Sequence, residues 1–90
     1  MTKLTTVVNC KTTPYDVLID RTTKFGNPWV VGKHGTREEV IALHRQWVLR
    51  RPELVAAIKR ELRGKVLGCH CKPKACHGDT LAAIANGELG

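Results

Sequence analysis

The residues best suited to chemistry lie close together near the end of the chain. The segment 69–79 reads CHCKPKACHGD and carries three thiols and two imidazoles, the side chains that hold most structural zinc ions. Structural zinc sites usually take two close ligands from each of two separated places, and here the second pair is missing. Zinc is one candidate cofactor although this spacing is not met, with Cys69, Cys71, Cys76 and His77 as the expected ligands and the distant Cys10 as an alternative fourth.

The same segment also has the composition of a reactive or anion-binding loop. A helix is predicted to begin near Gly78, and backbone amides at a helix N-terminus attract phosphate and lower the pKa of a nearby thiol. In this interpretation Cys76 is the nucleophile, and His77 and Asp79 complete the catalytic group. Lys72 adds positive charge for a ligand. The alternative is that these side chains only fix the turn by packing and hydrogen bonding.

A second polar segment lies far from the first in sequence. Residues 21–35 read RTTKFGNPWVVGKHG, with three glycines and no sustained period, which predicts a long loop. Arg21, Thr23, Lys24 and Asn27 place hydrogen-bond donors among these glycines, a composition that suits an anion. The segment lacks both the P-loop pattern and the dinucleotide fingerprint. A compact loop held by its own proline and aromatic side chains is the other interpretation.

The elements that must position these two segments follow from residue spacing. β-prone runs predict strands at 4–10, 16–20 and 65–71, with a short further strand open at 29–31. Apolar residues at helical spacing predict helices at 37–50, 52–63 and 79–85. This order predicts one α/β domain over residues 1–90, a partly parallel sheet of three to four strands covered by three helices.

Several residues set the limits and the buried faces of these helices. Thr36 and Glu39 form a capping box before the first helix, and Gly64 ends the second. His44 and Trp47 fall on the apolar face of the first helix, which predicts that both belong to the core. In α/β folds ligands collect at the carboxyl ends of strands, and the segment 69–77 lies at such an end.

The composition restricts the class of protein. Ninety residues support one hydrophobic core, so a second domain is not expected. The apolar runs are too short to cross a bilayer, and the first ten residues lack the apolar region of a secretory signal. We therefore expect a cytoplasmic protein with no membrane partner, whose four cysteines are free thiols or metal ligands rather than disulfides.

The charge keeps nucleic acid among the expected partners. Fifteen Lys and Arg against eight Asp and Glu give a net charge of +7. Basic residues punctuate the first two predicted helices at Arg45, Arg50, Arg51, Lys59, Arg60 and Arg63. Such a surface favours nonspecific nucleic-acid binding, although no recognised nucleic-acid-binding motif is present and solvation alone explains much of the charge.

Taken together, the two polar segments resemble domain-of-unknown-function family 4326, found in bacteria and their phages. The resemblance covers nearly the whole chain and depends on a paired pattern, R-x-T-x-x-GNP-aromatic followed by GK-x-LGC-x-C-x-P-x-x-CHGD-x-LA. It implies a small α/β fold and assigns no activity. The matching positions are Arg21, Thr23, Gly26, Asn27, Pro28, Trp29, Gly68, Cys69, Cys71, Pro73, Cys76, His77, Gly78 and Asp79.

These observations favour one function over two others. We expect the two segments to meet and form one polar site for a nucleotide, a nucleic-acid end or another phosphorylated ligand, with the donors of the segment 21–35 holding the anion. One alternative is a non-enzymatic interaction protein, such as a phage product that binds a host protein, with or without a structural zinc. The other is a nonspecific nucleic-acid-binding protein, whose affinity would fall steeply with salt.

Overall fold

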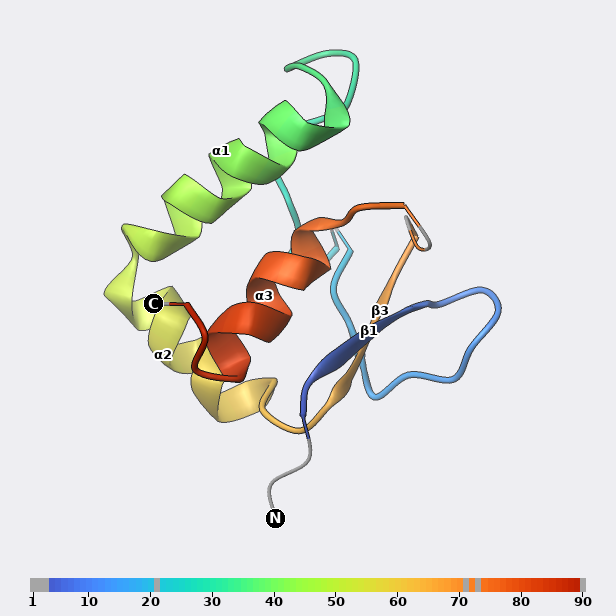
Figure 1. Ribbon diagram of the computed structural model, residues 1–90, viewed down its shortest axis with the longest axis vertical. Coiled ribbons are helices and arrows are strands. Elements are labelled where there is room, and N and C mark those ends of the chain that lie inside the picture. The colour runs from blue at the N-terminus through green and yellow to red at the C-terminus, as the bar shows by residue number, and fades with distance from the viewer. Residues whose placement is uncertain (1–3, 21, 71, 73, 90) are drawn as a thin grey trace.

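The part of the chain that the structure describes forms three strands and three helices, seen here in a computed structural model (Figure 1). The structure describes residues 4–20, 22–70, 72 and 74–89. The elements in chain order are β1 (Thr6–Asn9), β2 (Val17–Leu18), α1 (Arg37–Leu49), α2 (Pro52–Glu61), β3 (Val66–Cys69) and α3 (His77–Ala85). The predicted α/β class is confirmed, and the strands are shorter than predicted because pairing covers only part of each β-prone run.

The strands form one sheet in the order β1-β3-β2. The last strand therefore lies in the middle, and both of its pairings are parallel. Thr6 pairs with Val66, and Val17 pairs with Leu67. Residues 29–31 add no strand to this sheet, since Val31 makes only an isolated bridge with Gly35. All three described strands thus end at the same edge of the sheet.

The predicted helix limits hold at α1 and change at α3. Thr36 and Glu39 form the capping box before α1. The helix α3 begins at His77, two residues earlier than predicted, because Cys76 is its N-cap. The Cys76 sulfur accepts a hydrogen bond from a backbone amide, and the Asp79 carboxylate accepts one from the Cys76 amide. Residues 74–76 of the segment 69–79 therefore lead directly into the N-terminus of α3.

The helix α3 lies between the sheet and the other two helices (Figure 1). It contacts β1 and β3 on one side and α1 and α2 on the other. The core between these layers is apolar, and its fully buried members include Ile19, Ile58, Leu62, Leu67, Leu81 and Ile84. Within the described residues no helix has both the length and the apolar character that a membrane span needs.

The close approach of α3 to the sheet depends on Gly78. A Cβ atom at this position would lie 2.7 Å from the Ile19 Cδ1 atom and 2.9 Å from a Val7 methyl group. Gly78→Ala should therefore lower the free energy of unfolding by about 1–2 kcal/mol, because overpacking outweighs the better helix propensity of alanine. Denaturant unfolding measures this loss. Ile19→Val removes the nearest atom, so the double variant should lose less than the two single losses added; additive losses would contradict this account.

Candidate functional site

A pocket of about 300 Å³ lies between the two polar segments and the start of α1. It is lined by Asp20, Thr22, Asn27, Trp29, Val31, Arg37, Val40, Ile41, His70, Ala75, Cys76 and His77. One wall is apolar and comes mainly from α1 and the 29–31 segment. The other wall is polar and comes from the carboxyl edge of the sheet and the start of α3.

Asn27 stabilises the shape of the polar segment 21–35. Its side-chain amide donates to the Val40 carbonyl at 3.1 Å, and its carbonyl oxygen accepts from the Trp29 amide at 2.9 Å. Thr23 has a similar local role, since its hydroxyl donates to the Asp20 carbonyl at 3.0 Å and accepts from the Phe25 amide. Asn27 lines the pocket and Thr23 does not. These hydrogen bonds of Asn27 and Thr23 stabilise the loop that carries Trp29.

Two of the three predicted cationic ligand-binding residues, Lys24 and Lys72, make ion pairs within the described part of the chain. The Lys24 ammonium lies 2.7 Å from the Glu61 carboxylate of α2, outside the pocket lining. The Lys72 ammonium lies 2.7 Å from the Asp79 carboxylate, and this contact raises the pKa of Lys72. Asp79 also caps α3. The predicted residues Arg21 and Cys71 lie outside the described residues.

Cys76 and His77 face the pocket from the start of α3. The His77 Nε2 atom lies 2.7 Å from the Ile19 carbonyl oxygen, which can only accept, so Nε2 carries a proton. The neutral ring then has its lone pair on Nδ1, 3.7 Å from the Cys76 sulfur. Cys76 is 1% exposed, so its thiol has little contact with solvent. These two residues are adjacent and in contact, but the thiol is shielded.

A second histidine lies behind His77. The rings of His44 and His77 have centroids 5.1 Å apart, and His44 is fully buried. Neither ring nitrogen of His44 has a hydrogen-bond partner among the residues that the structure describes. Burial, and to a lesser degree the nearby His77, lower the pKa of His44 to about 3, with a smaller opposite effect from the Phe25 backbone. The prediction that His44 belongs to the core is confirmed.

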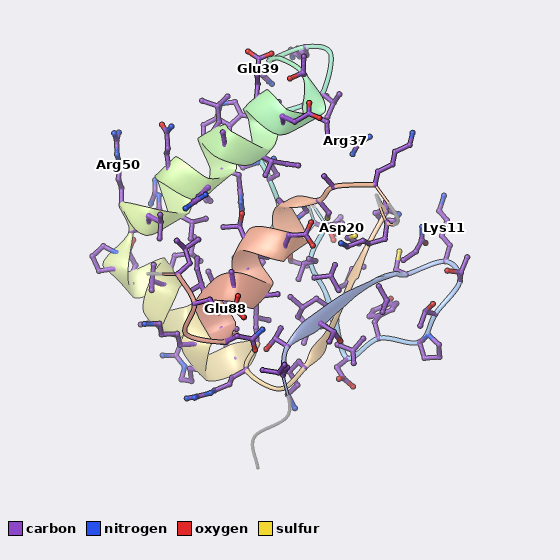
Figure 2. All side chains as sticks on the ribbon, in the orientation of Figure 1. Lys11, Asp20, Arg37, Glu39, Arg50 and Glu88 are labelled. Carbon is purple, nitrogen blue, oxygen red and sulfur yellow. The ribbon has the colours of Figure 1, made fainter. Side chains whose placement is uncertain are left out.

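Arg37 and Asp20 were not identified from the sequence as site residues, and both line the pocket. Arg37 is the first residue of α1, and its guanidinium donates to the Ala75 carbonyl at 3.4 Å, close to the start of α3 (Figure 2). Asp20 follows β2 at the sheet edge. Its carboxylate accepts a hydrogen bond from the Thr22 amide at 2.9 Å. The Thr22 hydrogen bonds, followed by the contact with His70, lower the pKa of Asp20.

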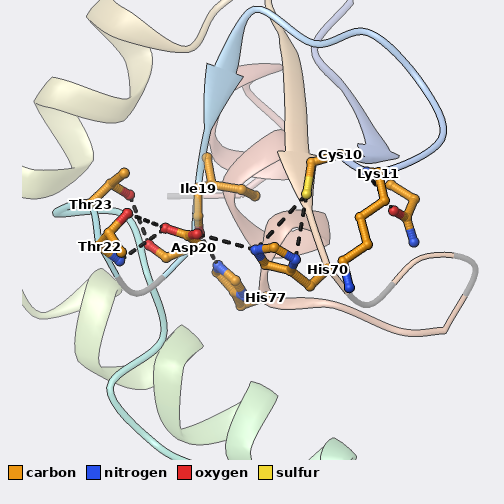
Figure 3. Close-up of polar contacts among 9 residues, drawn as sticks. Cys10, Lys11, Ile19, Asp20, Thr22, Thr23, His70 and His77 are labelled. Atoms are coloured by element: carbon orange, nitrogen blue, oxygen red, sulfur yellow. Dashed lines mark hydrogen bonds and ion pairs between the residues drawn. The ribbon is translucent and has the colours of Figure 1, made fainter.

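The carboxyl edge of the sheet holds one further group of polar side chains (Figure 3). The Cys10 sulfur lies 3.5 Å from the His70 Nδ1 atom, and the His70 Nε2 atom lies 3.2 Å from the Asp20 carboxylate. Cys10 follows β1 and His70 follows β3, so the group draws on the ends of all three described strands. The sequence singled out Cys10 only as a distant metal ligand.

The described residues contain no group of three or more His, Cys, Asp or Glu side chains arranged to hold a metal ion. The predicted zinc set includes Cys71, which lies outside the described residues, so zinc binding stays a prediction. Cys69 is 1% exposed and lies within β3. The described cysteines, Cys10, Cys69 and Cys76, form no disulfide with one another.

Comparison with known proteins identifies the family of this chain. The model of the family described as Domain of unknown function (DUF4326) matches residues 3–87 of the chain. The chain belongs to this family. The DUF4326 chain is also similar to the "Uncharacterized 12.4 kDa protein in nrdA-td intergenic region" of Enterobacteria phage T4. The two are 46% identical over 88 residues, which cover 93% of this chain and 80% of the relative. No solved structure gives a significant match to the chain.

Membership in DUF4326 confirms the expected family and a relative in a phage, and neither name carries an activity. The function of this DUF4326 chain therefore has to be argued from the pocket. The pocket lining includes the family-motif positions Asn27, Trp29, Cys76 and His77, together with Arg37 at the start of α1. The two halves of the motif are thus brought together by the fold.

Proposed function

We propose that this chain binds a nucleotide, or another small phosphorylated ligand with a planar group, in the pocket between its two motif segments. One observation carries the proposal: residues about fifty positions apart in sequence line a single pocket that combines an aromatic side chain with an arginine. A pocket of about 300 Å³ is at the lower end of the range typical of small-molecule sites. In this proposal the base and the sugar occupy the pocket and the phosphate lies beside Arg37.

The apolar wall suits the planar part of such a ligand. The Trp29 and Trp47 rings make an edge-to-face contact with centroids 6.1 Å apart, and this contact supports the orientation of Trp29. Val31, Val40 and Ile41 extend this wall. A base against Trp29 would gain the stacking and burial that aromatic side chains provide to nucleobases.

The cationic side of the pocket suits the phosphate. Arg37 is partly buried, and its contact with Ala75 holds the guanidinium beside the start of α3. Guanidinium groups bind phosphate through paired charge-assisted hydrogen bonds. The N-terminus of α3, where Cys76 and His77 line the same pocket, adds a favourable dipole for an anion. Thr22 supplies a polar group for the sugar.

The test is a binding measurement with a panel of nucleoside monophosphates and triphosphates, each paired with its unphosphorylated nucleoside. Isothermal titration at 0.15 M salt should show binding of at least one phosphorylated compound and weaker binding of its nucleoside. Arg37→Ala should weaken that binding about tenfold or more, because a hydrogen bond to a charged group contributes about 1.5–3 kcal/mol. Arg45→Ala is the matched control, since Arg45 is exposed on the same helix outside the pocket lining.

Other outcomes would contradict the proposal in distinct ways. Equal weakening by both arginine variants, together with a steep dependence on salt, would indicate binding to a basic surface and would favour the nucleic-acid alternative. If no compound of the panel binds to or stabilises the folded chain, the pocket is not a nucleotide site. That result would favour the alternative that the chain is a non-enzymatic interaction protein that binds another protein.

A further inference from the structure

The register of the sheet brings three reactive or ionisable side chains into one row. Gly68 of β3 pairs with Val8 of β1 on one side and with Leu18 of β2 on the other. Two residues further along each strand, the same register places His70 between Cys10 and Asp20. Residues two apart in a strand point to the same face, and neighbouring strands lie about 4.8 Å apart. Side chains in such a row are therefore neighbours, although Cys10 and Asp20 are 60 and 50 positions from His70 in the chain.

The contacts within this row run from Asp20 through His70 to Cys10. The Asp20 carboxylate lies 3.2 Å from the His70 Nε2 atom and is itself held by hydrogen bonds from the Thr22 amide and hydroxyl. Because a carboxylate accepts hydrogen bonds, Nε2 carries a proton, and the neutral ring keeps its lone pair on Nδ1. Nδ1 is the nitrogen closer to the Cys10 sulfur, at 3.5 Å against 3.9 Å for Nε2 (Figure 3).

We propose that Cys10 is the reactive thiol of this protein, with His70 as its general base and Asp20 as the residue that orients His70, and that it takes small disulfides as its substrates. His70 removes the thiol proton, with a small turn of its ring to align Nδ1 with the sulfur. The Cys10 thiolate attacks one sulfur of the disulfide, a new S–S bond forms and the old one breaks. The leaving thiolate takes the proton back from His70, so a thiol and a disulfide give a mixed disulfide and a thiol.

Accessibility favours Cys10 over the other described thiols. Cys69 and Cys76 are each 1% exposed, whereas Cys10 is only partly buried. The His70 side chain is 49% exposed, so a reagent can approach the pair from solvent. A thiol needs both a base and an open path to react, and among the described cysteines Cys10 has both.

The backbone around Cys10 favours attack on sulfur over attack on a carbonyl group. The Cys10 amide donates to the Cys69 carbonyl, the Lys11 amide to the Asn9 side chain, and the Thr12 amide to the Asn9 carbonyl. Acyl transfer requires free donors to stabilise an oxyanion, and these three amides are already used. Exchange with a disulfide develops no oxyanion and needs none of them.

The proposal does not depend on nucleotide binding. His70 and Asp20 line the pocket, but Cys10 does not, and the thiol can be assayed without a nucleotide. The probe is 2,2′-dithiodipyridine, a neutral disulfide whose released thione is followed by absorbance, added to the folded wild-type chain at pH 7. The labelled cysteine is then located by peptide mass analysis.

We expect one thiol to react at least about tenfold faster than the rest, and the label to be on Cys10. Cys10→Ser, with Cys10→Ala as a second variant if the first does not fold, should remove the fast phase. His70→Ala should slow it about tenfold or more, and added imidazole should restore part of the rate. Lys11→Ala is the matched control and should change the rate by no more than about twofold, because Lys11 neighbours Cys10 but is not the base.

Asp20 is a positioning residue, so its test uses a double variant. Asp20→Asn should slow the exchange in the wild-type chain and have no further effect when His70 is already alanine. A further loss in that background would mean that Asp20 only supports the local structure. Labelling of Cys71 or Cys76 in the fast phase, a wild-type rate in His70→Ala, or no rescue by imidazole would each overturn the proposal.

Discussion

Lowering the pH from 7.5 to 4.5 should reduce the free energy of unfolding by about 3 kcal/mol through His44 alone. In the unfolded chain this ring takes up a proton near its ordinary pKa of 6.5, whereas in the folded chain burial lowers the pKa to about 3. Between these values the unfolded state binds more protons than the folded state, so stability falls as the pH falls. The full loss, reached below pH 3, approaches about 5 kcal/mol, a large share of the stability of a small domain.

The measurement is denaturant unfolding at several pH values for the wild-type chain and for His44→Leu. Leucine has no titrating group and fills a similar volume, so the variant should lose stability much less steeply between pH 6.5 and 4.5. It should also be more stable at neutral pH by about 1–3 kcal/mol, because the described structure offers neither ring nitrogen a hydrogen-bond partner.

The carboxylates of the chain act at lower pH and do not obscure this result. Hydrogen bonds lower the pKa values of Asp20, Glu39 and Glu61 below the ordinary values of 3.8 for aspartate and 4.5 for glutamate. Their stabilising effect is complete above those values and is lost only as the pH falls further. If His44→Leu is as sensitive as the wild-type chain between pH 6.5 and 4.5, another group causes the loss and the assignment to His44 is wrong.

Asn27→Ala is expected to lower the free energy of unfolding by about 2–4 kcal/mol. The substitution removes a buried donor from the Val40 carbonyl and a buried acceptor from the Trp29 amide. The loop would then lose its hydrogen bond to Val40 of α1, and the Trp29 ring would no longer be held in position. Denaturant unfolding measures the loss, and hydrogen exchange of the Trp29 amide should show faster opening of the loop. Asn27→Asp keeps the acceptor for the Trp29 amide, so its free energy of unfolding should lie between those of the wild-type chain and Asn27→Ala.

Asn86 provides the matched control for Asn27. Its side chain also makes two hydrogen bonds to backbone, accepting from the Thr5 amide at 2.8 Å and donating to the Thr5 carbonyl at 3.1 Å. Asn86→Ala should therefore reduce stability as well, but it lies outside the pocket lining and should leave the affinity for a nucleotide unchanged. Equal effects of the two variants on affinity would mean that Asn27 acts only through global stability.

The helices were predictable from the sequence because their signals are local. The Thr36 and Glu39 capping box and the stop at Gly64, which has a φ of +74°, are set by residues within one turn of each helix end. The start of α3 was predicted two residues late because cysteine is an unusual N-cap, and its role emerges only with the capping contact of Asp79.

The site was less predictable because it depends on strand order. The segments 21–35 and 69–79 could be recognised by composition, but Cys10, Asp20 and His70 become neighbours only when β3 lies between β1 and β2. The strand order β1-β3-β2 cannot be read from the spacing of residues along the chain. Arg37 was missed for a related reason, since its helical position was evident and its direction toward Ala75 was not.

The central position of β3 also determines when this chain can fold during synthesis. Both β1 and β2 pair only with β3 in the described sheet, and the partner of Thr6 is Val66. A nascent chain therefore carries two unpaired strands until most of it has left the ribosome, while α1 and α2 can already form from local contacts. The sheet and α3 must then assemble in one late step, and until that step the two strands are open to pairing with other chains. Fragments that stop before Val66 should consequently be helical, lack a sheet and aggregate readily.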